Sequence, residues 1–238
     1  GFPHEESRDL MEYEEILGAN VRKLAKEYSK EKKKMMVLDV GSSTAKAISE
    51  IKDELGEKIE AHALAPINYP RHRVDCYHAL FAEHLPKWFE KKFDLIISNR
   101  TLQYAIFPHL ALRNIAQALA KGGTAVVNYE HDRYGPPEKQ FVAKLGKFLE
   151  RHGGTKLSEE ANKMLADLNN ANERRLQAIE QTLSSQNEGS ATNSRRTIVF
   201  CNEIARLIKS GKFEVTISEQ TRSNLGFVPR NILINRIK

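Results

Sequence analysis

Short apolar runs alternate with amphipathic stretches along the first 130 residues of the chain. Two of the runs, at 36–40 and 93–98, are mostly apolar, which is typical of parallel strands buried on both faces. The spacing of apolar residues predicts further strands at 58–64, 74–77 and 124–129 and helices at 8–30, 45–55 and 108–120. This alternation predicts an α/β fold with a doubly wound, mostly parallel sheet and helices on both of its faces.

The pattern changes after residue 130. We expect helices at 138–152, 158–183 and 195–210, a flexible linker at 184–194, and strands at 213–219 and 231–237. The two strands would add an antiparallel hairpin to the edge of a sheet that then has seven strands. The expected divisions are an N-terminal helical segment (1–34), the α/β core (35–130), a helical insertion or lid with its linker (131–194), and a helix and hairpin completing the core (195–238).

The expected helix at 158–183 has only a thin apolar stripe, so it cannot bury much surface on both sides. The stripe consists of Ala161, Leu165, Leu168, Leu176, Ile179 and Leu183. We expect this helix to cap a cleft or to offer a surface to a partner protein.

Composition and charge narrow the class of protein. The chain of 238 residues is 40% hydrophobic and 29% charged, as expected for a soluble globular protein. The net charge of +6 is spread, and its densest run, Lys30–Lys34, lies where lysines complement a helix dipole. The charge pattern therefore allows nucleic acid as a partner but does not indicate it. No window approaches about 18 uninterrupted apolar residues, so no membrane span is expected.

The cysteines and histidines are too few and too scattered to predict a bound metal. Cys76 and Cys201 are far apart, which suggests free thiols in a reducing compartment such as the cytoplasm. His72, His78 and His84 are six residues apart, without ligand-type spacing, so we expect no metal site. The N-terminus lacks a signal-peptide pattern, but Gly1 in place of Met leaves a removed targeting segment open.

The turn after the first expected strand is the clearest candidate for a ligand-binding site in the sequence. Asp39 and Gly41 are followed by the hydroxyl residues Ser42, Ser43 and Thr44, and then by a helix-like pattern. Such a turn lies at the carboxyl end of a strand, where open α/β sheets bind ligands. Amides at a helix N-terminus favour anionic groups there. The alternative is an ordinary strand-to-helix turn without a ligand.

Four segments in order resemble the class I S-adenosylmethionine-dependent methyltransferases, which are Rossmann-like. They read V-L-D-V-G-S-S-T, A-H-A-L-A-P, A-E-H-L-P with F-D-L-I-I-S-N, and I-A-Q-A-L-A-K-G-G-T-A-V-V. The resemblance implies S-adenosylmethionine as the cofactor. It also implies cofactor contacts from Asp39, Gly41, Ser42, Ser43, Thr44, Ala63, Leu64, Phe81, Ala82 and Asn99.

The chain departs from the family pattern at three places. The family turn reads G-x-G-x-G, but Ser43 and Ala45 stand at the second and third glycine positions, where a Cβ atom disfavours a positive φ. Ala63 stands where an acid binds both ribose hydroxyls, and Phe81 where an acid accepts a bond from adenine. Glu83 is an alternative acceptor for that bond.

Three functional interpretations therefore remain. The first is methyl transfer to a small-molecule or protein acceptor, which relies mainly on proximity and orientation and needs no universal base. His131 and Tyr104, which follow expected strands, are the candidate catalytic residues. The alternative is an inactive methyltransferase-like binding or scaffold module, a pseudoenzyme, because the ribose and adenine acids are missing. A Rossmann-like domain for another ligand is a third reading.

Overall fold

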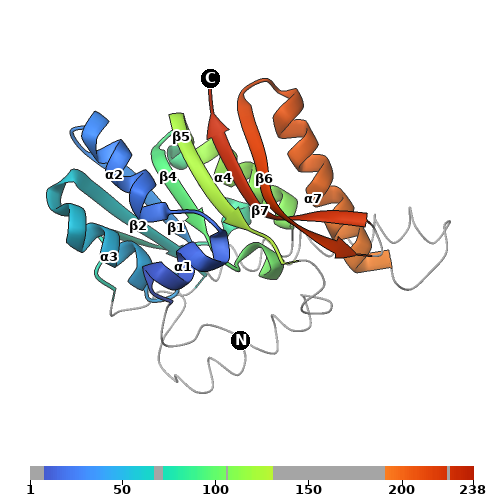
Figure 1. Cartoon of the computed structure of the whole chain (residues 1–238), viewed down its shortest axis with the longest axis horizontal. Helices are drawn as coiled ribbons and strands as arrows, with labels where there is room; N and C mark the ends of the chain where they lie inside the picture. Colours follow the sequence, from blue (N-terminus) through green and yellow to red (C-terminus); the bar gives the residue numbers. More distant parts are fainter. Residues whose placement is uncertain (1–7, 67–71, 106, 131–190, 224–225) are drawn as a thin grey trace, which may run out of the picture.

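The structure is a computed structural model, and it describes residues 8–66, 72–105, 107–130, 191–223 and 226–238 (Figure 1). Seven strands form one sheet: β1 Met35–Val40, β2 Ile59–Ala65, β3 Cys76–Ala79, β4 Phe93–Ser98, β5 Leu119–Asn128, β6 Phe213–Ser223 and β7 Gly226–Arg236. The helices are α1 Leu10–Leu17, α2 Val21–Glu31, α3 Lys46–Leu55, α4 Pro108–Ala118 and α7 Ala191–Lys209. Short 3₁₀ turns are η1 Gly56–Lys58, η2 Ala82–His84, η3 Lys87–Phe89 and η4 Leu102–Tyr104.

The strand order is β3-β2-β1-β4-β5-β7-β6. Strands β1 to β5 pair in parallel, and β7 pairs antiparallel with both β5 and β6. This confirms the predicted doubly wound, mostly parallel seven-stranded sheet with a C-terminal antiparallel hairpin.

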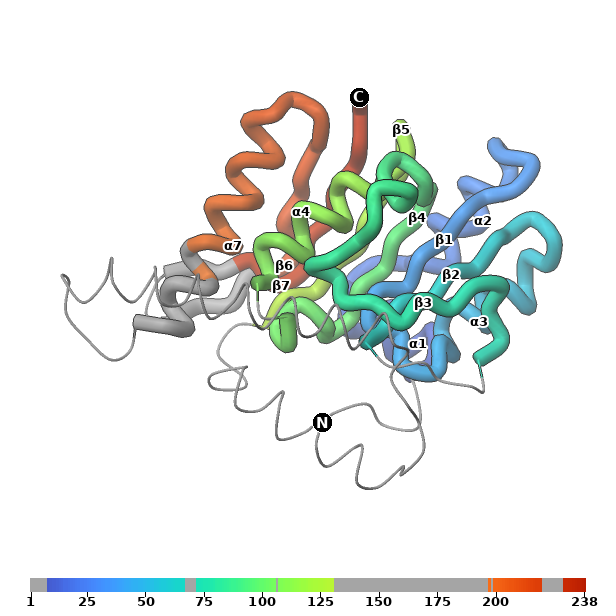
Figure 2. The backbone as a smooth tube through the Cα atoms, turned by 180° about the vertical axis from the view of Figure 1, so that it is seen from behind, coloured from blue at the N-terminus to red at the C-terminus, as the bar shows by residue number. Residues whose placement is uncertain are grey.

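Helices cover both faces of the sheet, as the two opposite views in Figures 1 and 2 show. Side chains of α1, α2 and α3 pack with Val37 of β1 and Ile97 of β4 on one face. Side chains of α4 and α7 pack with Leu38 and Ile96 on the other. Successive side chains of a strand point to opposite faces of the sheet. Because helices bury both faces here, the central strands must be mostly apolar.

The prediction of one helix over 8–30 was wrong, because caps divide this stretch into α1 and α2. Asp9 and Glu12 form a capping box at the start of α1, and Gly18 ends that helix with φ 61°. Asn20 then caps α2 by accepting a hydrogen bond from the Lys23 amide. Glycine after a helix and asparagine before one are common cap residues, so the break was readable in the sequence.

The hairpin is longer than predicted, because residues between the two expected strands, Gly226 and Pro229 among them, lie inside β7. Pro229 pairs with Gln220 next to a register irregularity, where a missing amide donor is tolerated. The helix expected at 108–120 ends at Ala118, and β5 begins directly after it.

The helices expected at 138–152 and 158–183 lie outside the described residues, as does the linker apart from its last four residues. These last residues belong to α7, which therefore begins before the predicted residue 195. Within the described ranges, no helix is long and apolar enough to cross a membrane.

Candidate functional site

The turn after β1 is bonded to the end of β2. The amides of Gly41 and Ser42 donate to the carbonyl oxygen of Leu64, at 2.6 and 3.2 Å. The Ala45 amide then donates to the Ser42 carbonyl at 2.8 Å, and α3 starts at the next residue. The predicted strand, turn and helix are therefore present, at the carboxyl ends of two neighbouring parallel strands.

Gly41 is fixed by its φ of 83° and by the close approach of Thr101. A Cβ atom at Gly41 would lie 1.9 Å from Thr101 Oγ1, which is far inside contact distance. Thr101 Oγ1 in turn donates to the Val40 carbonyl at 3.0 Å. The segment after β4 is thus pressed against the turn, and no larger residue fits at position 41.

Ser43 and Ala45 keep the conformation of a glycine turn without being glycines. Their φ angles are 51° and 61°, so residues 41, 43 and 45 all lie in the left-handed region. Both residues therefore adopt the positive φ that their Cβ atoms disfavour. A non-glycine residue held there costs of order 1–3 kcal/mol, and such strain clusters at functional sites.

Asp39 lies in the protein interior. Its side chain is wholly buried, and the Tyr13 hydroxyl of α1 lies 3.3 Å from both carboxyl oxygens. Burial raises the pKa of Asp39 to about 8, although the hydrogen bond from Tyr13 acts to lower it. The side chain that the resemblance assigned to cofactor binding is therefore already bonded to the N-terminal helix.

The second strand brings no carboxylate to the position that the resemblance assigns to ribose. Ala63 is wholly buried and pairs in register with Asp39 of β1 and Tyr77 of β3. The Tyr77 hydroxyl donates to the Ser43 carbonyl at 2.6 Å. An aromatic side chain from the edge strand therefore reaches the turn beside Ala63.

The segment around Phe81 packs toward α4. Phe81 is 7% exposed, and the Ala82 carbonyl accepts a hydrogen bond from Asn114 Nδ2 at 3.0 Å. Glu83 Oε1 accepts from the amide of Phe107, the N-cap residue of α4, at 3.4 Å. This contact gives Glu83 a structural partner, which differs from the adenine contact considered from the sequence.

Two polar side chains at the end of β4 are buried without a partner among the described residues. Ser98 is wholly buried and Asn99 is 5% exposed. Neither Ser98 Oγ nor the amide atoms of Asn99, Oδ1 and Nδ2, have a hydrogen-bond partner in the part of the chain that the structure describes. Leaving such groups unpaired costs about 1–3 kcal/mol each, so they are candidates for binding a ligand.

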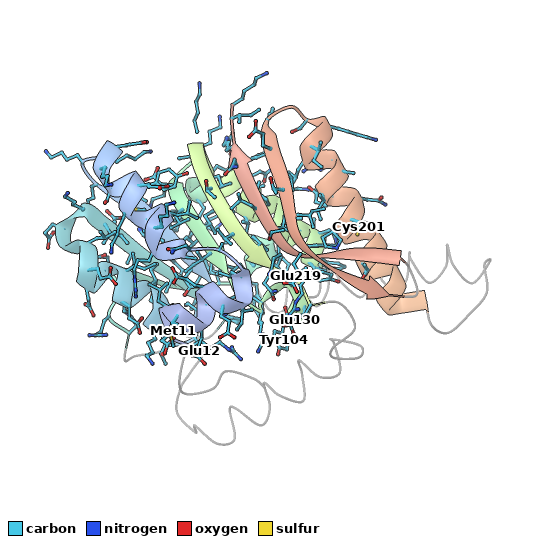
Figure 3. All side chains as sticks on the ribbon, in the orientation of Figure 1. Met11, Glu12, Tyr104, Glu130, Cys201 and Glu219 are labelled. Carbon is cyan, nitrogen blue, oxygen red and sulfur yellow. The ribbon has the colours of Figure 1, made fainter. Side chains whose placement is uncertain are left out.

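A charged network lies nearby, after β4 and β5. Arg100 Nε donates to Glu130 Oε1 at 3.0 Å, and Arg230 lies 3.7 Å from the same oxygen. Arg230 also contacts Glu219 at 2.8 Å. Figure 3 shows Tyr104, Glu130 and Glu219 toward the same end of the sheet.

The sequence indicated Arg100 and Glu130 only as residues that follow strands, and it gave no sign of Arg230. Arg230 reaches Glu130 because β7 pairs with β5, and the Tyr129 amide donates to the Arg230 carbonyl at 2.7 Å. Of the two candidate catalytic residues, Tyr104 lies in η4 and is partly buried, whereas His131 lies outside the described residues.

Comparison with known proteins gave one family match and several distant structural similarities. A family model described as a methyltransferase domain matches residues 11–185. No curated protein matches the chain in sequence.

Three solved structures illustrate the structural similarity. A putative S-adenosyl-L-methionine-dependent methyltransferase from Methanococcus maripaludis is 14% identical over 100% of this chain and 98% of its own, with a TM-score of 0.43. The 1,6-didemethyltoxoflavin-N1-methyltransferase of Burkholderia thailandensis, solved with 1,6-didemethyltoxoflavin and S-adenosylhomocysteine, is 12% identical over 92% and 78%, with a TM-score of 0.44.

The third is a putative methyltransferase in complex with the Haloferax volcanii Trm112 methyltransferase activator. It is 19% identical over 47% of this chain, with a TM-score of 0.36, and the chain spans 53% of its length. The family model covers well over half of the chain, and the observed sheet is the one that the resemblance implied. The chain therefore belongs to the methyltransferase domain family, with its class I, Rossmann-like fold.

Proposed function

We propose that this chain binds S-adenosylmethionine at the carboxyl ends of β1, β2 and β4 and transfers its methyl group to a small-molecule or protein acceptor. The observation that carries the proposal is the left-handed conformation of residues 41, 43 and 45. A strained turn of this kind persists only where its surroundings fix it, and here it lies where open α/β sheets bind ligands.

Some residues at the carboxyl ends of these strands suit a ligand that carries both hydrogen-bond donors and acceptors. The amide of Asn99 offers both a donor and an acceptor, and Ser98 offers a hydroxyl, while no described partner uses these atoms. We assign binding of the polar end of the cofactor to Ser98 and Asn99. We expect the cofactor to lie against the backbone at Gly41. Ala63 supplies no bond to the ribose hydroxyls, so we expect weaker binding than with an acid at that position.

The cofactor supplies an electrophilic methyl group on a sulfonium. The contribution of the chain is to hold the acceptor in line with that methyl group and to exclude water. We place the acceptor toward Tyr104 and the carboxylate of Glu130, which Arg100 and Arg230 hold in position. A charged, hydrogen-bonded surface of this kind favours a polar acceptor over an apolar one.

A second function, binding without methyl transfer, is favoured by one observation. The acid at the end of β1 is committed to Tyr13, and no carboxylate stands at position 63. A chain that keeps the turn but lacks these ligands would serve as a methyltransferase-like binding or scaffold module.

Isothermal titration calorimetry of the full chain with S-adenosylmethionine and S-adenosylhomocysteine tests the proposal. We expect dissociation constants in the micromolar range and about tenfold weaker binding for Asn99→Ala, because one charge-assisted bond is worth roughly that much. Asn235→Ala is the matched control. Asn235 accepts from Thr124 Oγ1 in the middle of β5, four residues before the carboxyl end of that strand, so its loss should leave binding unchanged.

Absence of binding at millimolar concentration of both compounds would contradict the cofactor assignment. Binding of S-adenosylmethionine that never yields S-adenosylhomocysteine with any polar acceptor tested would support the binding module instead.

A further inference from the structure

Four side chains with metal-binding atoms share one face of β2 and β3. Glu60 and His62 lie two residues apart on β2, and Cys76 and His78 lie two apart on β3. His62 pairs in register with Cys76, and since side chains of paired residues point the same way, all four face one side of the sheet. One ligand atom each from Glu60, His62 and Cys76 lies within 4.8 Å of the other two.

The imidazole of His62 is buried and held at both of its nitrogens. Its exposed fraction is 1%. Nε2 lies 2.8 Å from Glu60 Oε1, and Nδ1 lies 2.9 Å from Nε2 of His78. If Nε2 binds a metal ion, Nδ1–H can still donate to His78. Metal-binding histidines are oriented in this way by a second hydrogen bond.

Aromatic rings flank this cluster, and its outer side stays accessible. Phe93 meets His62 edge-on at 5.2 Å, and Phe89 meets His78 in the same way at 5.0 Å. Such an apolar wall limits access of water to a site. Because β3 is the edge strand and the Glu60 side chain is 30% exposed, an ion has a path to the site.

We propose that Glu60, His62 and Cys76 bind a divalent metal ion of the zinc class, with water as a fourth ligand and His78 orienting His62. The donor set of one carboxylate oxygen, one imidazole nitrogen and one thiolate suits zinc better than magnesium or calcium, which take oxygen ligands. Bond lengths of 2.0–2.3 Å to zinc require ligand atoms roughly 3.3–3.8 Å apart. On binding, Glu60 Oε1 and His62 Nε2, now 2.8 Å apart, therefore separate slightly, while the Cys76 thiol, whose ligand atom lies within 4.8 Å of theirs, adjusts to the same spacing.

Lys34 and the thiol proton of Cys76 both affect metal binding at this site. Lys34 lies 3.2 Å from Glu60 Oε2, which leaves Oε1, the oxygen that faces His62, for the ion. Cys76 releases its thiol proton to solvent when it binds the metal as a thiolate. The ion would join the short edge strand β3 to β2, and this role does not depend on cofactor binding at the turn after β1.

The test uses the untagged full chain, stripped of metal with a chelator and titrated with Zn²⁺ and then with Co²⁺. We expect one ion per chain, a higher unfolding temperature with Zn²⁺, and an intense near-ultraviolet thiolate-to-metal band with Co²⁺. Cys76→Ser should lose the band and weaken binding at least tenfold. Cys201→Ser is the matched control and should keep both, because Cys201 lies on α7 (Figure 3).

Two further variants separate loss of a ligand from loss of the fold. His62→Gln should abolish binding, and His78→Gln should weaken it about tenfold, as loss of an orienting partner does. Circular dichroism of each metal-free variant shows whether it folds. No uptake by the wild type, or equal uptake by folded Cys76→Ser, would overturn the proposal. Neither result would bear on S-adenosylmethionine binding.

Discussion

The hydroxyl of Tyr13 lies 3.3 Å from each carboxyl oxygen of Asp39, and both side chains are buried. This contact joins the N-terminal helix α1 to the strand that leads into the candidate cofactor turn. Burial raises the pKa of Asp39 to about 8 in spite of the Tyr13 bond. Asp39 is therefore mostly protonated at neutral pH, which makes it an interior hydrogen-bonding group.

The first prediction concerns the pH dependence of stability. An unfolded Asp loses its proton near pH 3.8, whereas native Asp39 keeps it up to about pH 8. Between these values the native state binds more protons, so this group lowers the free energy of unfolding as pH rises, by up to about 1.4 kcal/mol per unit. Asp39→Asn removes this effect. Urea unfolding at pH 5 and pH 8 should show the variant gaining stability relative to wild type at the higher pH.

Tyr13→Phe is the control for that experiment. It should cost about 1 kcal/mol through the lost hydrogen bond, while the titration of Asp39 remains. Parallel pH profiles for wild type and Asp39→Asn would show that Asp39 is not protonated in the native state.

The second prediction concerns strain in the turn. Ser43→Gly should raise the free energy of unfolding by up to about 1 kcal/mol, because glycine relieves the left-handed φ but makes the unfolded chain more flexible. Gly41→Ala should lower it by about 3 kcal/mol or more, since the new Cβ meets Thr101 as well as the φ restriction.

Gly56→Ala separates these two causes. Gly56 has φ 56° and ψ −131°, but a Cβ there meets nothing within 4 Å, so only backbone strain of order 1–3 kcal/mol is expected. Thermal unfolding of the three variants would rank them. Equal losses for Gly41→Ala and Gly56→Ala would mean that the approach of Thr101 is unimportant.

The third prediction tests whether position 63 of β2 corresponds to the position at which the family has an acid that binds the ribose. Ala63→Asp should be destabilised by several kcal/mol without cofactor, because a second carboxyl is buried next to Asp39. If position 63 faces ribose, S-adenosylhomocysteine should raise the unfolding temperature of this variant more than that of wild type. Ala63→Asn controls for size. An equal rise in all three proteins would show that position 63 does not face the ribose.

The fourth prediction concerns the docking of α7 on α4. Arg113 donates two hydrogen bonds to Glu203, one to each carboxylate oxygen, at 3.1 and 2.7 Å, and Arg206 donates two more to Oε1, at 2.8 and 2.5 Å. Burial acts to raise the pKa of Glu203, but the bonds from both arginines outweigh it and leave the pKa lowered. The stabilisation is therefore present at neutral pH and is lost as pH falls below about 4.5.

Glu203→Gln should cost about 1.5–3 kcal/mol at pH 7, and the cost should shrink in acid. Arg206→Gln is the matched comparison. Arg206 is half exposed and lies on the same helix as Glu203, so its loss should cost less than about 1 kcal/mol. Denaturant unfolding at pH 7 and pH 4 measures both, and equal losses would contradict the dominant role of Arg113.

Much of the fold could be predicted because the sheet is buried on both faces. β1 and β4 confirm the runs read at 36–40 and 93–98, since a strand covered twice must be mostly apolar. The break between α1 and α2 was missed because the apolar stripe continues through Gly18, although the cap residues were visible.

The candidate site was less predictable, because its properties arise from pairing between distant segments. His62 lies beside Cys76 because of the parallel register of β2 and β3, and sequence spacing alone cannot show that register. The approach of Arg230 to Glu130 likewise depends on the position of β7. The positive φ of Ser43, which its Cβ atom disfavours, could not be predicted either, because contacts of the turn with β2 and Thr101 override the local preference of the residue.

The position of β7 has a consequence for how the chain folds as it is made. β7 is the last of the seven strands in sequence, yet it lies between β5 and β6 (Figure 1). Its Asn231 also donates to the carbonyl of Ile16 in α1, 215 residues earlier. Until β7 leaves the ribosome, β5 exposes an unpaired edge that other chains can join. We therefore expect the chain to be open to edge-to-edge association during synthesis until β7 inserts.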